Sequence, residues 1–125
     1  MIKHILLVAV GGAVGAVARY CCTLWLPKSD SVGSVFWVNA VGCMLIGLIM
    51  GAITKTSMQA QWQMSLKLLL VTGFCGGFTT FSTFTYEGLQ FLHEQRYFSF
   101  LWFSFASLIT GFLATAVGIY ASKFL

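Results

Sequence analysis

The apolar residues of this chain fall into four long runs separated by short polar connections. A helix needs about 20 predominantly apolar residues to cross the hydrocarbon core of a membrane, and all four runs reach that length. The pattern therefore predicts an all-α integral membrane protein with four transmembrane helices, at about residues 2–26, 34–53, 64–92 and 98–124. The connections carry turn-forming and charged residues, at 27–30, 54–61 and 93–96. They leave no room for a soluble domain, so we expect a single domain over residues 1–125.

The third run is longer than one crossing requires. As a straight helix it would extend roughly 43 Å at 1.5 Å per residue, against a hydrocarbon core of about 30 Å. Residues 73–85 lie near its middle and hold three glycines, five hydroxyl side chains and four phenylalanines. Backbone groups at membrane depth must find partners, so clustered glycines favour a helix that is locally broken beside protein or a water-filled path. We predict a break at mid-membrane, near Gly76 and Gly77, whose exposed carbonyls and amides suit a cation and an anion respectively.

Two kinds of side chain follow this predicted break. Phe81 and Phe84 are three residues apart and share one side of the helix. A phenyl ring has a positive edge, so these rings could favour an anion, although phenylalanines at helical spacing are ordinarily packing residues. A second stripe is polar and consists of Thr79, Ser82, Thr83 and Tyr86.

Polar residues inside the first two spans need partners. Arg19 follows Gly11 and Gly15 at four-residue intervals, so the three share one face. Its guanidinium either reaches toward water at the end of the span or faces a polar path within the membrane. Asn39 either bonds a neighbouring helix or contacts a permeant ligand.

The last span carries a stripe of small and partly polar residues, which are Ser104, Ser107, Gly111, Thr115 and Gly118. The 3.6-residue period places them along one side of the helix. Their hydroxyls either bond carbonyls of their own helix while the stripe packs against the third span, or they offer protons to an ion between the helices.

Composition supports a membrane protein, since 58% of the residues are hydrophobic and 8% are charged. The formal net charge is +4, but the cations are scattered, which argues against a nucleic-acid surface. The four cysteines lie in apolar runs without Cys-x-x-Cys spacing, which favours free buried thiols, at positions 21, 22, 43 and 75.

The placement of charge gives almost no orientational bias. Four spans place both termini on one side, which divides the cations into Lys3, Lys55, Lys67 and Lys123 on that side and Arg19, Lys28 and Arg96 on the other. The positive-inside rule therefore does not select an orientation. We expect a protein that inserts in both orientations and assembles as an antiparallel two-fold dimer.

Three sequence blocks, at residues 73–84, 11–20 and 38–42, occur in an order that resembles the Fluc (CrcB) family of bacterial fluoride ion channels. The resemblance covers essentially the whole chain. It implies a dual-topology antiparallel homodimer in the bacterial inner membrane, with two fluoride pores. It also implies a structural sodium ion (Na+) at the dimer interface.

The resemblance assigns roles to individual residues. The sodium ion would be bound by the backbone carbonyls of Gly76 and Thr79 from both subunits. The anion path would be lined by Asn39, Phe81, Phe84, Ser82, Thr83 and Thr115. Glu87 aligns with an acidic vestibule position of the family. Arg19 is kept as a second vestibule candidate, although the resemblance gives it no role. The last span departs from some relatives at Phe103 and Gly111, where they have a serine or tyrosine, and Ser107 is retained as a candidate on that side.

Fluoride holds its water tightly, so a pore must replace hydration with several weak donors and still release the ion. The absence of Lys and Arg from residues 72–88 agrees with such a path. Neutral HF crosses membranes and dissociates inside the cell, and the trapped anion would leave passively through the channel. The sequence indicates no enzyme, because it shows no nucleotide loop and no nucleophile paired with a base.

Two alternatives use the same four-helix pattern. A small proton-coupled multidrug exporter shares four short helices and antiparallel dimers. Such a carrier needs a protonatable carboxylate deep in its first span, and residues 2–26 contain no Asp or Glu. A purely structural membrane subunit would be separated from a channel by an ion-flux assay.

Overall fold

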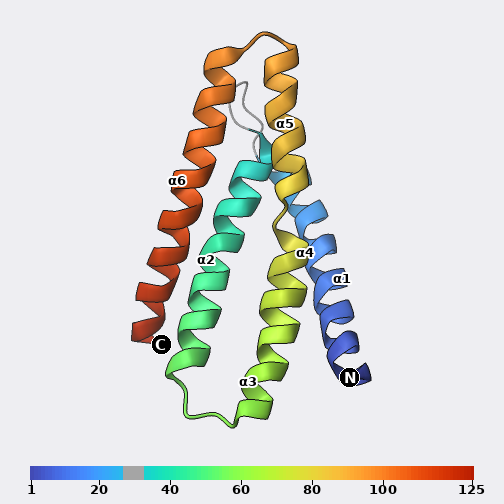
Figure 1. Ribbon diagram of the computed structural model, residues 1–125, viewed down its shortest axis with the longest axis vertical. Coiled ribbons are helices and arrows are strands. Elements are labelled where there is room, and N and C mark those ends of the chain that lie inside the picture. The colour runs from blue at the N-terminus through green and yellow to red at the C-terminus, as the bar shows by residue number, and fades with distance from the viewer. Residues whose placement is uncertain (27–32) are drawn as a thin grey trace.

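The computed structural model describes residues 1–26 and 33–125, so the connection expected at 27–30, with Lys28, lies outside the described residues. The described residues form helices and their connections (Figure 1). In chain order the helices are α1 (Ile2–Trp25), α2 (Ser34–Lys55), α3 (Ala60–Leu66), η1 (Lys67–Cys75), α4 (Gly76–Phe78), α5 (Phe81–His93), α6 (Tyr97–Ala121) and η2 (Ser122–Phe124).

Four helical segments are long and apolar enough to cross a membrane. They are Ile2–Trp25, Ser34–Lys55, Ala60–His93 and Tyr97–Phe124. The prediction of four spans is confirmed, with boundaries that differ from the expected ones by a few residues. The largest difference is in the third span, which begins at Ala60 because α3 extends it at its N-terminal end.

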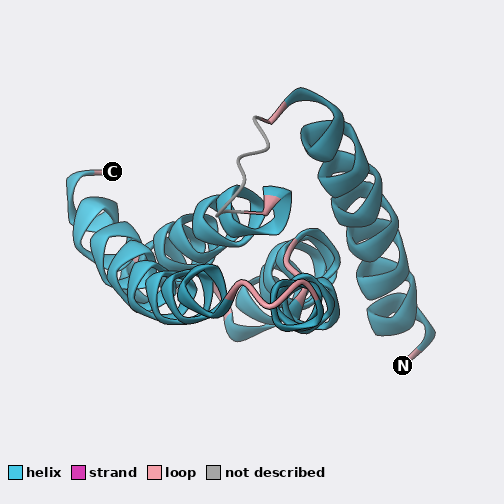
Figure 2. Ribbon diagram, turned by 90° about the horizontal axis from the view of Figure 1, so that it is seen from above, coloured by secondary structure: helices cyan, strands magenta, loops and turns pink. Residues whose placement is uncertain are grey.

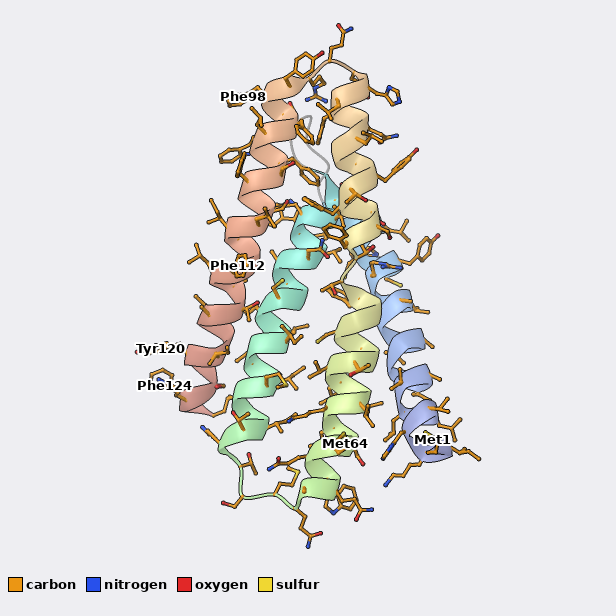
Figure 3. All side chains as sticks on the ribbon, viewed as in Figure 1. Met1, Met64, Phe98, Phe112, Tyr120 and Phe124 are labelled. Carbon is orange, nitrogen blue, oxygen red and sulfur yellow. The ribbon has the colours of Figure 1, made fainter. Side chains whose placement is uncertain are left out.

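The four spans pair into two closely packed sets. α2 packs along α6, and α1 packs along η1 and α4. Seen from above, α1 and α6 lie at opposite edges, with α2 and the third span between them (Figure 2). Both termini lie at the same end of the bundle (Figure 1). Many large apolar side chains point outward and are exposed, as lipid-facing residues are; Phe98, Tyr120 and Phe124 are examples (Figure 3).

Glycines allow the helix backbones to approach each other in both sets. A Cβ on Gly11 would collide with the Leu69 carbonyl, and one on Gly47 would collide with the Thr115 carbonyl. Small residues at helix contacts are the usual means of close packing in membranes. Gly11 and Gly47 therefore lie at close helix contacts.

The third span is interrupted, but the break does not lie at the glycines. Gly76 has helical dihedral angles, with φ −62° and ψ −38°, whereas Thr79 and Thr80 are extended, with ψ 157° and 123°. Figure 1 shows the chain losing its coil between α4 and α5. The predicted break is therefore present, but it begins two residues after Gly77. Gly77 itself serves packing, since a Cβ there would meet the backbone of Gly12 and Ala16.

The nine residues before Gly76 form a π-helix, which the sequence did not predict. The Gly76 N–H donates to the carbonyl of Val71, five residues earlier, as well as to that of Gly73. Such helices are rare and occur frequently at functional sites. This one leads directly into α4 and the break.

Candidate functional site

Asn39 of α2 binds the extended backbone at the break. Its Nδ2 donates to the Thr80 carbonyl at 3.0 Å, and the Thr80 N–H donates to its Oδ1 at 2.8 Å. The side-chain amide thus satisfies both backbone groups of one residue, as a neighbouring peptide group would. Backbone groups at membrane depth require such partners, so this pair stabilises the interruption.

The bond to Asn39 changes the end of the preceding helix. In a continuing α-helix the Thr80 N–H would donate to the Gly76 carbonyl, four residues earlier. Here it donates to Asn39. The Thr79 N–H and hydroxyl both donate to the Cys75 carbonyl, at 2.9 and 2.8 Å. The last carbonyls of α4 therefore lie at a helix C-terminus, the end that attracts cations.

A groove of about 680 Å³ runs along α2, the third span and α6. It is mostly apolar, and its lining includes most of the site residues predicted from the sequence. Those residues are Asn39, Gly76, Thr79, Phe81, Phe84, Ser107 and Thr115. The structure thus brings side chains from three spans together at the break.

The two phenylalanines of the predicted anion path have different surroundings. Phe81 is 74% exposed, whereas Phe84 is half-buried against the core formed by Val35, Phe91 and Phe103. The Phe84 and Phe103 ring centroids are 5.2 Å apart, and those of Phe81 and Phe84 are 5.7 Å apart. Phe84 is therefore a packing residue that also reaches the groove, while Phe81 is mostly uncovered in the single chain.

Thr115 and Ser107, two of the three α6 hydroxyl residues that line the groove, also differ. Thr115 Oγ1 donates to the Gly111 carbonyl at 3.0 Å, so its proton is used within its own helix. Ser107 Oγ is buried and has no hydrogen-bond partner among the described residues. A buried hydroxyl without a partner is costly and uncommon in proteins. The Ser107 hydroxyl therefore remains able to donate to an ion, whereas that of Thr115 does not.

Ser82 and Thr83 belong to the first turn of α5. Thr80 Oγ1 accepts from the Thr83 N–H at 3.3 Å and lies 3.1 Å from Ser82 Oγ and 3.4 Å from Thr83 Oγ1. The Thr80 side chain thus caps α5, as Thr commonly does at a helix N-terminus. Ser82 and Thr83 do not line the groove with Phe81 and Phe84, although Thr80 does.

A second, smaller cavity of about 210 Å³ lies between α1, α2 and α5. Arg19 and Thr83 line it, together with the hydroxyl residues Tyr20, Thr23 and Ser34. Thr80 lines both this cavity and the groove. Arg19 therefore lines a different cavity from Phe81 and Phe84, and Thr80 is the residue common to the two linings.

Glu87 lies at the N-terminal end of α2. A Cβ added to Gly33, the N-cap of that helix, would collide with the Glu87 carboxylate. A carboxylate at a helix N-terminus is electrostatically favourable. The Glu87 carboxylate can occupy this place only because residue 33 is a glycine and has no side chain.

Sequence reasoning did not single out Thr80, although it contacts Asn39, caps α5 and lines both cavities. Its backbone binds Asn39 and its hydroxyl caps α5. A threonine three residues before another polar residue and an apolar run is a helix-start signal, and it could have located the break. Cys43 and Cys75 also line the groove without having been assigned a role.

Comparison with known proteins covers nearly the whole chain. A family model described as "CrcB-like protein, Camphor Resistance (CrcB)" matches residues 6–119. A protein of Gloeothece citriformis named "Fluoride-specific ion channel FluC" is 44% identical over 124 residues, which cover 96% of this chain and 97% of its own length. A protein of the same name from Chlorobium chlorochromatii is 40% identical, over 98% of this chain and 94% of its own length. Another from Phocaeicola vulgatus is 38% identical, over 97% of this chain and 99% of its own length. The chain belongs to the CrcB-like family of membrane proteins, whose relatives include these fluoride-specific channels.

Proposed function

We propose that this protein is a fluoride-specific ion channel, not an enzyme, and that fluoride moves along the groove beside the helix break. The observation that carries the proposal is the full-length similarity to several proteins named as fluoride-specific channels. The position of Asn39, Phe81 and Ser107 around one groove agrees with it. In a bacterial inner membrane the channel would let cytoplasmic fluoride leave passively.

The groove offers the weak donors that a fluoride path needs. Ser107 has an uncommitted hydroxyl, and Asn39 uses one of its two amide protons on Thr80, which leaves the other for an anion. The ring edges of Phe81 and Phe84 add partial positive charge. Groups of this kind can replace part of the hydration shell without holding the ion as tightly as a buried cation would.

A sodium ion fits the chemistry of the break. Hard cations prefer oxygen ligands, and the C-terminal carbonyls of α4 carry partial negative charge. Because Asn39 takes the Thr80 N–H, the Gly76 carbonyl loses its usual helical donor. The carbonyls of Gly76 and Thr79 are the groups that would hold sodium, which would stabilise the break and a pair of subunits meeting there.

We further propose that two chains assemble in antiparallel orientation. The described chain leaves Phe81 74% exposed and the groove along α2 and α6 uncovered on one side. Lys and Arg residues at the two ends of the spans are nearly balanced, so either orientation can insert. A second copy would cover the groove and complete two separate fluoride paths.

Arg19 and Glu87 are proposed to act outside the narrow part of the path. The Arg19 guanidinium and several hydroxyl groups line this cavity. A positive charge beside hydroxyl donors suits an anion that has not yet reached Thr80 and Thr83. Ser82 and Thr83 would form the polar track at the start of α5. Glu87, at the N-terminal end of α2, would set the local charge at the mouth of the cavity.

The decisive experiment is fluoride efflux from liposomes that contain the purified chain, with chloride as the control ion. We expect rapid fluoride loss and retention of chloride. Vesicles that retain fluoride, or that lose both ions at the same rate, would contradict the proposal. Replacing sodium with a large organic cation during purification tests the sodium site, and unchanged assembly and flux would argue against it.

A further inference from the structure

Two thiols that the proposed fluoride path does not use lie in the same groove. Cys43 comes from α2 and Cys75 from the end of η1, and both are free cysteines. Cys75 is 2% exposed. Cys43 Sγ lies 3.6 Å from the position that a Cβ on Gly111 would take, so it points toward α6 across the groove.

The surrounding contacts place the two cysteines on adjoining walls. Gly42, next to Cys43, faces the Thr79 side chain closely enough that an added Cβ would collide with it. Thr79 lies one turn after Cys75 and donates both its N–H and its hydroxyl to the Cys75 carbonyl. Thus α2 and η1 place both cysteines in the lining of one groove, beside the break.

We propose that Cys43 and Cys75 form a two-sulfur site for a soft metal ion that prefers linear two-coordination, and that its occupation blocks the groove. Cysteine sulfur selects soft ions over hard ones. The described residues contain no group of three or more His, Cys, Asp and Glu side chains that could hold a metal. A site with two sulfurs and no further such ligand suits linear coordination better than the four-coordinate geometry of zinc.

Mercury(II) is the appropriate probe because its binding moves no net charge into the groove. In chloride-free neutral solution it is present as uncharged Hg(OH)₂. Two Hg–O bonds break and two Hg–S bonds form, while the two thiol protons leave with the hydroxides as two water molecules. Nothing is oxidised or reduced. The S–Hg–S product is also uncharged, which avoids the cost of burying an ion among apolar side chains.

The chain contains its own control thiols. Cys21 and Cys22 lie on α1 and are not among the residues that line the groove. Fluoride efflux should be blocked by mercury in the wild type and in Cys21→Ser/Cys22→Ser. It should not be blocked in Cys43→Ser/Cys75→Ser, with each rate expressed relative to the same variant without metal. Single variants at Cys43 or Cys75 lose the second, intramolecular contact, so about 100-fold more mercury should be needed.

A thiol titration in detergent tests the site without relying on flux. In Cys21→Ser/Cys22→Ser, one mercury per chain should protect both remaining thiols. The shared site would be refuted if one mercury protected only one thiol. It would also be refuted if the same mercury concentration blocked efflux in the single Cys43 and Cys75 variants as in the protein that has both cysteines. The block of flux rests on the proposed function, whereas the thiol count does not. If the protein conducts no fluoride before mercury is added, the proposed channel function is refuted. The thiol titration would still show whether Cys43 and Cys75 bind one metal ion together.

Discussion

Asn39 binds both backbone groups of Thr80, a residue 41 positions away in sequence, through the two ends of one side-chain amide. The pair connects the second turn of α2 to the point where the third span loses its helical hydrogen bonds. It explains why a polar residue lies within an otherwise apolar span. It also means that loss of Asn39 affects the break itself as well as the groove.

Replacing Asn39 with alanine should destabilise the protein and reduce fluoride flux. Both Thr80 backbone groups would lose their partners at membrane depth, at a cost of about 1–3 kcal/mol. The unfolding temperature in detergent and liposome flux measure the two effects. Thr80→Ala is the matched control, because it keeps both backbone bonds to Asn39 and loses the cap of α5, which is worth about 1 kcal/mol, together with the hydroxyl contacts to Ser82 and Thr83. Wild-type stability in Asn39→Ala would contradict this role.

Substitutions at the two phenylalanines should separate conduction from packing. Phe81→Ile removes an exposed ring and should lower fluoride flux while leaving assembly and stability unchanged. Phe84→Ile should lower flux and also stability, by about 1 kcal/mol, because its ring packs on Phe103. Phe105→Ile, on an exposed part of α6 outside the groove, is the control and should change neither. Wild-type flux in both groove variants would refute an aromatic contribution to the path.

Ser107→Ala should reduce flux with little effect on stability. The Ser107 hydroxyl has no partner among the described residues, so its removal should change the free energy of unfolding by no more than about 0.5 kcal/mol. A hydrogen bond to an ion is worth about 1.5 kcal/mol or more, which corresponds to a roughly tenfold lower flux. Ser104→Ala, one turn away and outside the groove, provides the comparison. A large loss of stability in Ser107→Ala would show instead that its hydroxyl has a structural partner.

Length and hydropathy were sufficient to predict the four spans, because a membrane requires a minimum apolar length from each helix. The existence of a break could also be predicted from the excess length of the third span. Its position could not, because glycine is equally suited to unwinding a helix and to close packing. Here Gly77 packs against α1, and the extended residues are Thr79 and Thr80.

Other features of the site depend on contacts between distant residues. The π-helix at Lys67–Cys75 has no signature of its own, since its apolar run would fit an α-helix equally well. The sequence does not distinguish Phe81 from Phe84, because both lie beside the polar stripe of α5. The contact with Phe103 on α6 is what makes Phe84 the packed ring and leaves Phe81 the exposed one. The partner of Asn39 could not be identified from sequence because it is a backbone group.

Two adjacent glycines of α1 offer a test of the packing against the third span. A Cβ on Gly11 would collide with the Leu69 carbonyl, whereas one on Gly12 would lie 3.9 Å from the Gly73 carbonyl, an ordinary contact. Gly11→Ala should therefore cost about 1–3 kcal/mol through overpacking. Gly12→Ala should be neutral or slightly stabilising, since alanine also favours the helix. The unfolding temperatures of the two variants measure the difference, and equal values would contradict the described contact.

Lys55 joins the end of α2 to the end of the last span, and its removal should loosen that end alone. Its Nζ donates to the carbonyls of Ser122 and Leu125 at 2.8 and 2.7 Å, at the end of the last helix. Lys55→Met keeps the apolar stem and should cost about 1 kcal/mol. Hydrogen exchange should become faster around Ser122, while fluoride flux stays unchanged because Lys55 does not line the groove. Lys123→Met is the matched control, since Lys123 lies over the Tyr120 ring and should leave exchange at Ser122 unaltered. Equal exchange in the two variants would mean that the Lys55 contacts do not hold the helix end.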